Sequence, residues 1–321
     1  MTRVLVTGAS GFVGRALCDV LVEAGYTVRG AFRNVASPAR ADIERVQVGE
    51  INGSTDWVRA LEGVDHVVHL AARVHVLHDR AGNSPLYAET NAYGTQRLAE
   101  AASRADVQRF LYVSSIKVNG EETGGTAYTA LDEPHPKDAY GASKLLAERL
   151  LSQVTVNTSL QAAIVRPPLV YGPGVRANFL RLMSWVEKGW PLPLGAVRNQ
   201  RSLVSVWNLC DLLRNLLVNA AAPGRTWLVS DGADLSTADL IRRIASAMNR
   251  RAMLFPMPTG ALFALGALIG RRSEVERLCG SLVVDTRATR RDLGWTPPVG
   301  VDESIARTVA WYQSQRQSDG R

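Results

Sequence analysis

The stretch Thr7-Gly8-Ala9-Ser10-Gly11-Phe12-Val13-Gly14 decides the fold of this chain. It follows a short apolar run at residues 4–6 and precedes a segment with helical periodicity. A strand, a glycine turn and a helix start, in that order, predict a site for a diphosphate, because backbone N–H groups and the helix dipole face the anion. The residues of the turn expected to contact a dinucleotide are Gly8, Ser10, Gly11, Phe12, Val13 and Gly14.

A second motif, Tyr140-Gly-Ala-Ser-Lys144, lies further along the chain. A tyrosine and a lysine four residues apart share one face of a helix. An ammonium near a phenol favours the phenolate, so we expect Lys144 to lower the pKa of Tyr140 below its usual value near ~10. The pair would then supply a proton donor and acceptor beside the dinucleotide.

Together and in this order, the two motifs resemble the short-chain dehydrogenase/reductase superfamily. The length of the chain and the motifs after residue 166 are similar to its extended branch, the nucleotide-sugar epimerase/dehydratase/reductase group. The resemblance runs from Val4 to about Trp311. It implies a Rossmann-type α/β fold, with a doubly wound parallel sheet and a smaller C-terminal substrate-binding lobe.

The composition agrees with a globular enzyme. The chain has 321 residues, of which 46% are hydrophobic and 21% charged, so it can bury a large core. A net charge of +7 without a basic run or a basic–aromatic stripe does not favour nucleic acid as a partner. Three cysteines without metal-like spacing predict a reducing compartment, here the cytoplasm.

No targeting or transmembrane segment is expected. The chain runs from Met1 directly into a strand, which leaves no room for a signal peptide. The apolar stretch 254–269 is broken by Pro256 and Pro258, and what remains is too short for a span of ~20 residues. We expect a buried or dimer-facing helix there, and peripheral contact with a membrane stays open.

Apolar runs alternate with helical periodicity through the first half of the chain, which predicts a parallel sheet with helices on both faces. Strands are expected at 4–6, 27–32, 46–48, 66–70, 109–114 and 162–166, and helices at 13–24, 56–61, 85–103 and 140–153. After Tyr171 the rhythm changes, with one return to strand at 226–230. We expect a dinucleotide-binding domain at 1–172 continued by 203–230, a lobe from 173–202 and 231–321, and a disordered tail at 313–321.

The resemblance also implies which residues hold the cofactor. Phe32 stands where NAD-specific members carry Asp, and Arg33 follows it, which favours NADP(H) while NAD stays open. Glu50 and Ile51 correspond to the pair that contacts adenine. Asn91 matches an asparagine that supports Lys144 and the loop after the fifth strand. The other expected cofactor contacts are Leu70, Ala71, Ala72, Ser114, Tyr140, Lys144 and Pro167.

The implied catalytic residues are Ser115, Tyr140 and Lys144. Ser115 would hydrogen-bond the reacting oxygen of a sugar and Tyr140 would transfer its proton, while Lys144 would bind the nicotinamide ribose. The 4,6-dehydratases carry an Asp-Glu pair after this serine, whereas this chain has Ile116-Lys117, which disfavours dehydration. The run 114–121 resembles a subgroup of UDP-glucose 4-epimerase-like proteins and of 4-ketoreductases that make UDP-N-acetyl-6-deoxyhexosamines.

On the substrate side, Asn178 and Arg201 match positions that bind the nucleotide diphosphate, since an arginine fork suits two phosphoryl oxygens, and Lys117 and Ser115 complete the expected set. His75-x-x-His78 has no acidic or cysteine partner at ligand spacing, so no metal is expected.

The leading hypothesis is a reductase that uses NADPH at C4 of a UDP-linked N-acetylated 6-deoxy-4-ketohexose. The alternative is a UDP-sugar 4-epimerase with tightly bound NAD, and a non-catalytic nucleotide-binding protein is a third candidate. The resemblance further implies a homodimer through the helices that carry Asn91 and Tyr140, with Leu98, Leu145 and Leu146 as available apolar residues.

Overall fold

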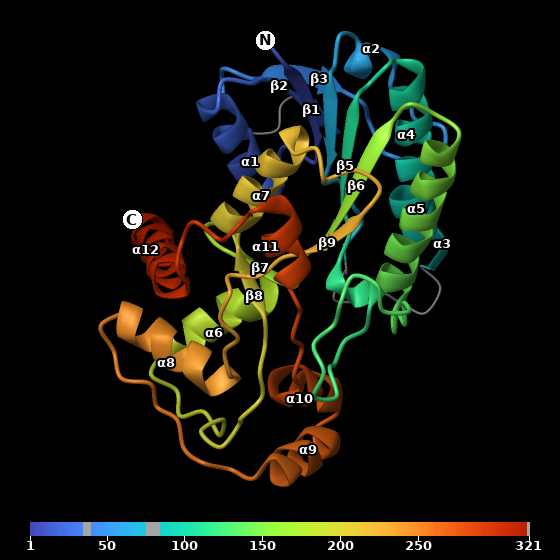
Figure 1. Cartoon of the computed structure of the whole chain (residues 1–321). Coiled ribbons are helices and arrows are strands. Elements are labelled where there is room, and N and C mark those ends of the chain that lie inside the picture. Colours follow the sequence, from blue (N-terminus) through green and yellow to red (C-terminus); the bar gives the residue numbers. More distant parts are fainter. Residues whose placement is uncertain (35–39, 75–83, 320–321) are drawn as a thin grey trace.

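A computed structural model describes residues 1–34, 40–74 and 84–319. Its described residues form a parallel sheet of seven strands at the centre of the molecule (Figure 1). The strands, in spatial order, are β3 (Glu44–Gln47), β2 (Thr27–Phe32), β1 (Arg3–Thr7), β4 (His66–His69), β5 (Arg109–Val113), β6 (Gln161–Arg166) and β9 (Thr226–Leu228). The strand order reverses between β1 and β4, which is where open parallel sheets bind ligands. The predicted doubly wound fold is confirmed.

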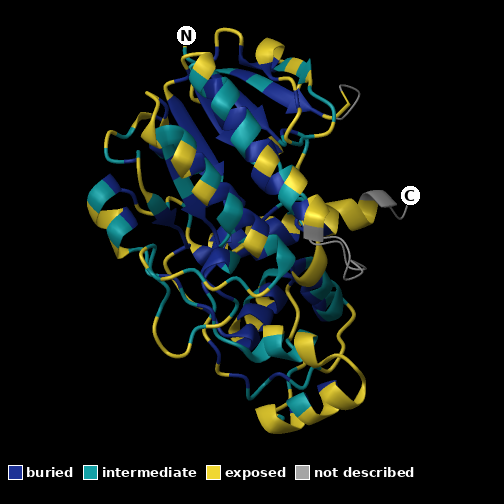
Figure 2. Ribbon diagram, turned by 90° about the vertical axis from the view of Figure 1, so that its right-hand side faces the viewer, coloured by how far each residue is buried: buried dark blue, intermediate teal, exposed yellow. Residues whose placement is uncertain are grey.

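Helices cover both faces of the sheet. One face carries α1 (Phe12–Glu23), α7 (Val206–Val218) and α11 (Arg287–Leu293). The other carries α2 (Val58–Leu61), α3 (Ser84–Tyr87), the π-helix η1 (Ala88–Tyr93), α4 (Gly94–Arg104) and α5 (Ala139–Val156). The central strands are therefore buried on both sides, which explains their continuous apolar runs (Figure 2).

A second core lies below the sheet. It is built from a two-stranded parallel sheet, β7 (Leu169–Tyr171) and β8 (Leu203–Ser205), and from α6 (Ala177–Glu187), α8 (Thr237–Ala247), α9 (Thr259–Leu268), α10 (Arg272–Cys279) and α12 (Val301–Asp319). Phe12 packs against this core and against the core of the sheet, so the glycine turn lies where the two meet. Leu293 and Trp295 pack into the sheet core although they fall in the segment expected to form the lobe.

Two local expectations were wrong, and a third is narrowed. The helix expected at 85–103 is interrupted by η1, whose wider turn rotates the side chains that follow. The tail expected to be disordered is helical as far as Asp319, because Ile305, Val309 and Tyr312 anchor α12 to the lobe. Of the two alternatives expected for the apolar stretch 254–269, a buried helix is excluded, because α9 begins after Pro258 and is largely exposed, and a dimer-facing helix stays a prediction.

Candidate active site

The glycine turn between β1 and α1 is tightly packed. Gly8 has a φ of +68°, and a Cβ atom at this position would lie 3.0 Å from the amide nitrogen of Ala71. A Cβ on Gly14 would lie 2.1 Å from the carbonyl oxygen of Gly8, so only glycine lets α1 start this close to the turn. Gly11 caps α1, and no described side chain bonds its first amides. The turn therefore presents free N–H groups at a close backbone approach, which fits a dinucleotide diphosphate.

The loop after β4 is fixed to this turn through Thr7. Its hydroxyl oxygen accepts hydrogen bonds from the amides of Leu70 and Ala71, both at 3.2 Å. It also lies 2.7 Å from Nδ1 of His69, whose Nε2 lies 3.0 Å from the hydroxyl of Thr95. Burial, and then the charge of Lys144, lower the pKa of His69 to about 3, so the ring is neutral. Leu70, Ala71 and Ala72 are half-buried beside the glycine turn.

The ribose end of the expected site differs from the sequence expectation. Phe32 is buried in the sheet core, with the guanidinium of Arg45 4.9 Å from its ring centroid, so it faces no ligand. Arg33 is exposed and forms an ion pair with Glu50, with 3.1 Å between Nε and Oε1. The carboxylate that sequence reasoning assigned to adenine thus neutralises the arginine assigned to a 2′-phosphate. Ile51, next to Glu50, packs against Gly94.

Asn91 lies in η1 and holds the loop after β4. Its Oδ1 accepts the amide of Arg73 at 2.7 Å, and its Nδ2 donates to the carbonyl oxygen of Arg73 at 3.0 Å and to Oγ of Ser143 at 2.9 Å. The contacts expected between Asn91 and Lys144, and between Asn91 and the loop after β5, are not among these three hydrogen bonds. Asn91 therefore joins the loop after the fourth strand to the neighbour of Lys144 on α5.

The loop after β5 carries two serines. Ser115 begins the short helix η2 (Ile116–Val118), and its Oγ accepts the amide of Lys117 at 3.3 Å. The amide of Ser114 donates to Val165 at 2.7 Å, and the amide of Ile116 donates to the carbonyl oxygen of Pro167 at 3.0 Å. These bonds bring Ser114, Ser115 and Pro167 together at the carboxyl edge of the sheet, where the glycine turn also lies.

Tyr140 lies in the first turn of α5, half-buried, with Tyr87 edge-on at 6.5 Å between ring centroids. Burial raises the pKa of Tyr140 to about 12; the charge of Asp138 raises it as well, and the nearby Ser115 hydroxyl lowers it. Lys144 is not among the groups that set this pKa, so the expected lowering is wrong. The Ser115 hydroxyl is nevertheless near enough to act on the pKa of Tyr140, as expected for two groups that would meet one substrate oxygen.

Lys144 is 2% exposed and points under the sheet edge. Its Nζ donates to the carbonyl oxygen of Val113 at 2.7 Å and lies 4.4 Å from the ring centroid of Tyr112. Burial lowers the pKa of Lys144 to about 7, and Glu148 raises it. Sequence reasoning missed Tyr112, Val113 and His69 as the surroundings of this lysine. The rings of Tyr112 and His69 stack with 5.7 Å between their centroids, on neighbouring strands. Predicting this pair would have required the register of β4 against β5, which the sequence alone does not give.

Lys117 is occupied by two carboxylates. Its Nζ lies 2.8 Å from Glu121 and 2.5 Å from Asp138. Burial lowers its pKa, but the hydrogen bonds with Asp138 and Glu121 outweigh it and raise the pKa above its usual value. The other oxygen of Asp138 accepts the amide of Gly141 at 2.7 Å and so caps α5. Lys117 therefore braces the start of the helix that carries Tyr140.

The expected substrate residues of the lobe are not bonded to the catalytic set. Asn178 is exposed at the start of α6. Nη1 of Arg201 donates to the carbonyl oxygens of Arg277 at 3.0 Å and of Gly280 at 2.9 Å, at the end of α10. Burial lowers the pKa of Arg201. Among the described residues, neither Asn178 nor Arg201 forms a hydrogen bond with Ser115, Tyr140 or Lys144.

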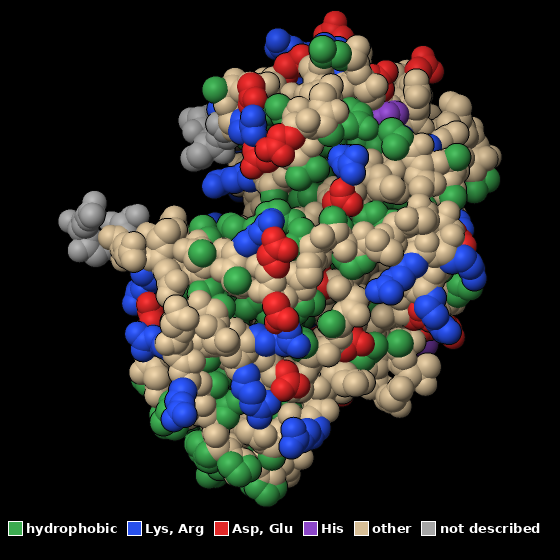
Figure 3. Space-filling model, turned by 60° about the vertical axis from the view of Figure 1, so that its left-hand side comes forward, with side chains coloured by type: hydrophobic (Ala, Val, Ile, Leu, Met, Phe, Trp, Pro, Cys, Tyr) green, Lys and Arg blue, Asp and Glu red, His purple; other side chains and the backbone are tan. Residues whose placement is uncertain are grey.

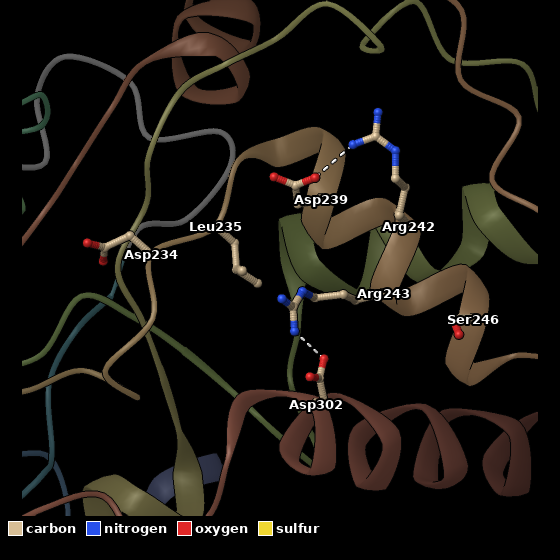
Figure 4. A pocket seen from close by; sticks show the side chains of 7 residues that line it. All are labelled: Asp234, Leu235, Asp239, Arg242, Arg243, Ser246 and Asp302. Atoms are coloured by element: carbon tan, nitrogen blue, oxygen red, sulfur yellow. Dashed lines mark hydrogen bonds and ion pairs between the residues drawn. The ribbon is translucent and has the colours of Figure 1, made fainter.

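A depression elsewhere in the lobe carries charged side chains, but it is separate from the candidate active site. Figure 4 shows Arg242 directed at Asp239, and Arg243 directed at Asp302. The residues that line it are Asp234, Leu235, Asp239, Arg242, Arg243, Ser246 and Asp302. None of the residues expected to bind cofactor or substrate lines it, and both of its arginines are paired.

Within residues 1–34, 40–74 and 84–319, no group of three or more His, Cys, Asp or Glu side chains is arranged to hold a metal ion. His75 and His78 lie outside the described residues. None of the helices in the described part of the chain combines the length and apolarity that a membrane span needs.

A glycine turn at the switch point of a parallel sheet, with a serine, a tyrosine and a lysine at the same edge, defines an enzyme that works with a bound dinucleotide. The profile of the NAD dependent epimerase/dehydratase family matches residues 4–230, and the chain belongs to this family.

Three known proteins illustrate the likeness. The UDP-glucose 4-epimerase of Vibrio cholerae is 41% identical over 310 residues, which cover 95% of this chain and 94% of that protein. The structure of MoeE5 in complex with UDP-glucose and NAD is 26% identical, with a TM-score of 0.76, and the match covers 98% of this chain and 99% of that one. The fold is also that of UDP-glucose 4-epimerase from Thermotoga maritima, at a TM-score of 0.80, 20% identity, and coverage of 98% and 100%.

Proposed function

We propose that the protein exchanges hydride and proton at C4 of a UDP-linked hexose and that its net reaction is 4-epimerisation. The observation that carries the proposal is the common position of Ser115, at the start of η2, and Tyr140, in the first turn of α5, at the carboxyl edge of the sheet, with the Lys144 ammonium buried behind them on the carbonyl oxygen of Val113. The 41% identity with a UDP-glucose 4-epimerase over 95% of the chain supports the substrate class.

The residues of the site divide the work of such a reaction. Bound NAD(P) supplies the hydride acceptor and donor. Ser115 would orient the C4 oxygen through its hydroxyl, and Tyr140 would pass the proton to or from that oxygen. With its pKa raised to about 12, Tyr140 is protonated at neutral pH and is set as a donor. Reduction of a C4 ketone, which is the second half of an epimerisation, starts from that state.

Lys144 would hold the nicotinamide ribose. Its ammonium lies beneath the end of β5, fixed by the carbonyl oxygen of Val113 and the ring of Tyr112. A pKa of about 7 leaves a large part of it neutral at physiological pH, so a ligand hydroxyl that accepts a hydrogen bond would favour the charged form.

Dehydration fits this site less well. Ile116 occupies the position of the first of the two dehydratase acids. The nearby carboxylates of Glu121 and Asp138 are engaged by Lys117, and Asp138 also caps α5. Neither carboxylate is free to move a proton at a sugar carbon.

A second candidate is reduction of a UDP-linked N-acetylated 6-deoxy-4-ketohexose by NADPH. It is favoured by the missing carboxylate at the end of β2, where Phe32 is buried and Arg33 follows. The ion pair of Arg33 with Glu50 counts against it, because Arg33 would have to leave that carboxylate to meet a 2′-phosphate. NAD is therefore the cofactor we propose for the first candidate and NADPH for the second.

We further propose that Lys117, Asn178 and Arg201 contact the nucleotide sugar, and that the domains divide at 172–173, 202–203 and 230–231.

A homodimer through α4 and α5 remains a proposal. Leu98 is fully buried in the sheet core and cannot serve such an interface, while Leu145 and Leu146 are half-buried. The free cysteines Cys18, Cys210 and Cys279 support a cytoplasmic location.

The test is turnover of UDP-glucose and UDP-N-acetylglucosamine, followed by NMR with catalytic NAD and no added reductant. Epimerisation predicts a mixture of each active sugar and its C4 epimer, and Tyr140→Phe should remove it. If no sugar epimerises but a UDP-4-ketohexose is reduced with NADPH, the second candidate replaces the first.

A further inference from the structure

The helix α9 has an unusual combination of composition and exposure. Its ten residues, 259–268, contain no charged side chain, and apolar residues lie all around it. Helices that are apolar on all sides are found inside protein cores or in lipid. Only Leu262 and Gly266 of α9 are buried. Phe263 is half-buried, and the other residues of α9 are exposed.

The exposed residues form one patch at the outer end of the lobe, which we call the α9 patch. Its large side chains and their exposed fractions are Met253 (54%), Phe255 (41%), Leu265 (47%), Leu268 (84%) and Ile269 (59%). Figure 3 shows hydrophobic side chains gathered at the foot of the molecule, where Figure 1 places α9. Single exposed apolar residues are ordinary, but a contiguous group marks an interaction surface.

The patch is framed by positive charge. Residues 250–272 contain four arginines and no acidic residue. Arg250 and Arg251 precede the patch, and Arg271 and Arg272 follow it; all four are exposed. Arg250 and Arg251 form no ion pair with any described residue, whereas Arg271 and Arg272 face acids on the next helix at 4.0 and 3.0 Å. A partner for this surface must therefore be apolar at its centre and negative around it.

We propose that the α9 patch docks the protein on an anionic lipid surface, with α9 lying in the plane of the membrane. Ten helical residues reach about 15 Å, half of a hydrocarbon core of about 30 Å, so α9 can enter the interface but cannot span it. Leu268, Ile269 and Phe255 would enter the acyl boundary. The arginines at both ends would meet lipid phosphates, for which a guanidinium fork is well suited.

A second copy of the chain is a poorer partner for the same patch. A twofold contact places the same surface on both sides, so Arg250 and Arg251, which form no ion pair with a described residue, would be brought toward the same two arginines of the other copy. Like charges brought together in this way oppose association. An anionic bilayer satisfies the apolar and the charged residues at once.

Docking here would turn the substrate lobe, and not the sheet, toward the lipid. α9 packs on α10 through Gly266, where a Cβ atom would lie 2.6 Å from Val275. The carbonyl oxygens at the end of α10 hold Arg201. The docking surface is thus one helix away from a residue proposed to bind the nucleotide. The inference itself does not depend on which sugar is used.

The test is co-sedimentation of the full chain with vesicles of phosphatidylcholine, with and without 30–40% phosphatidylglycerol (about one anionic lipid in three, a composition at which basic segments bind). We expect binding to the anionic vesicles that weakens as salt rises. Leu268→Asp/Ile269→Asp should lower the bound fraction at least tenfold, and Arg271→Gln/Arg272→Gln should lower it and flatten the salt dependence. Val218→Asp, at an exposed apolar residue of α7, is the matched control and should bind like wild type.

All variants are first checked for wild-type helicity and thermal unfolding, and the double aspartate variant is expected to keep wild-type turnover. Wild type that stays in the supernatant with anionic vesicles at low salt would overturn the proposal. So would equal binding of the aspartate variant and the control. If wild type sediments in solution as an oligomer that Leu268→Asp/Ile269→Asp dissociates, the patch is a protein interface and the proposal is wrong.

Discussion

Replacing Lys144 with methionine keeps an unbranched side chain of similar length and removes a buried ammonium. Lys144 is 2% exposed, and burial lowers its pKa to about 7. Against an unfolded value near ~10.4, a shift of about three and a half units corresponds to roughly 4–5 kcal/mol of cost in the folded protein. Methionine escapes this cost but gives up the hydrogen bond to Val113 and the contact with the ring of Tyr112. Those losses are on the order of 1.5–3 and 0.5–2 kcal/mol, so the net effect below pH 7 lies between a loss of about 1 and a gain of about 3 kcal/mol, centred on a gain of about 1.

The gain should depend on pH in a definite direction. The folded pKa lies below the unfolded one, so below pH 7 both states hold the proton and wild type carries the full cost. Between about pH 7 and 10.4 the unfolded chain keeps a proton that the folded protein has lost, and wild-type stability rises with pH relative to the variant. The advantage of Lys144→Met should therefore be largest near pH 6 and fade toward pH 10.

Urea unfolding of both proteins at several pH values between 6 and 10 measures this difference, and steady-state assays of the same samples should show lost turnover. Lys137→Met, at an exposed lysine on the segment before α5, is the matched control and should show neither effect. A Lys144→Met protein whose stability relative to wild type does not fall as pH rises from 7 to 10 would refute the reasoning.

The remaining predictions concern the proton donor, the cofactor and the buried histidine. Tyr140→Phe should lower turnover by ~10²–10⁴ while NAD(P) affinity in fluorescence titration stays nearly unchanged; a loss of only a few-fold would remove Tyr140 from the mechanism. Glu50→Gln should free Arg33 and raise affinity for NADPH over NADH about tenfold, and an equal change for both cofactors would show that Arg33 does not meet a 2′-phosphate. The pKa of His69 is about 3 in the folded protein, so wild type should lose stability relative to His69→Asn as pH falls from 6.5, by up to about 1.4 kcal/mol per pH unit. If the free energies of unfolding of the two proteins change equally with pH, the prediction is contradicted.

The sheet, and the position of the candidate catalytic residues at its carboxyl edge, could be predicted because their signals are local or strongly periodic. Buried parallel strands are continuous apolar runs in the sequence. The turn after the first strand requires glycine because any side chain there would clash with the neighbouring backbone. Gly14, for example, leaves no room for a Cβ atom against Gly8. Ser115 and Tyr140 come from separate elements. Ser115 lies in the loop after β5 and Tyr140 lies in the first turn of α5, and both of these positions are at the same edge of the sheet.

Features that depend on side-chain direction or on distant partners could not be predicted. Phe32 and Arg33 are neighbours in sequence, yet the first points into the core and the second pairs with Glu50 in the loop after β3. The pKa of Tyr140 depends on how deeply the ring is buried, which the spacing to Lys144 does not contain. The exposure of α9 could not be predicted either. An apolar sequence does not show whether other elements of the fold pack against the helix that it forms.

The central claim is that Tyr140 passes the proton of the C4 oxygen of a UDP-hexose, which Ser115 orients, while bound NAD removes and returns the C4 hydrogen as hydride. NMR of UDP-glucose deuterated at C4, incubated with wild type and catalytic NAD, tests it most directly. The account predicts the C4 epimer with deuterium still at C4, and no epimer with Tyr140→Phe. An epimer that has lost its deuterium to water, or undiminished epimerisation by Tyr140→Phe, would contradict it.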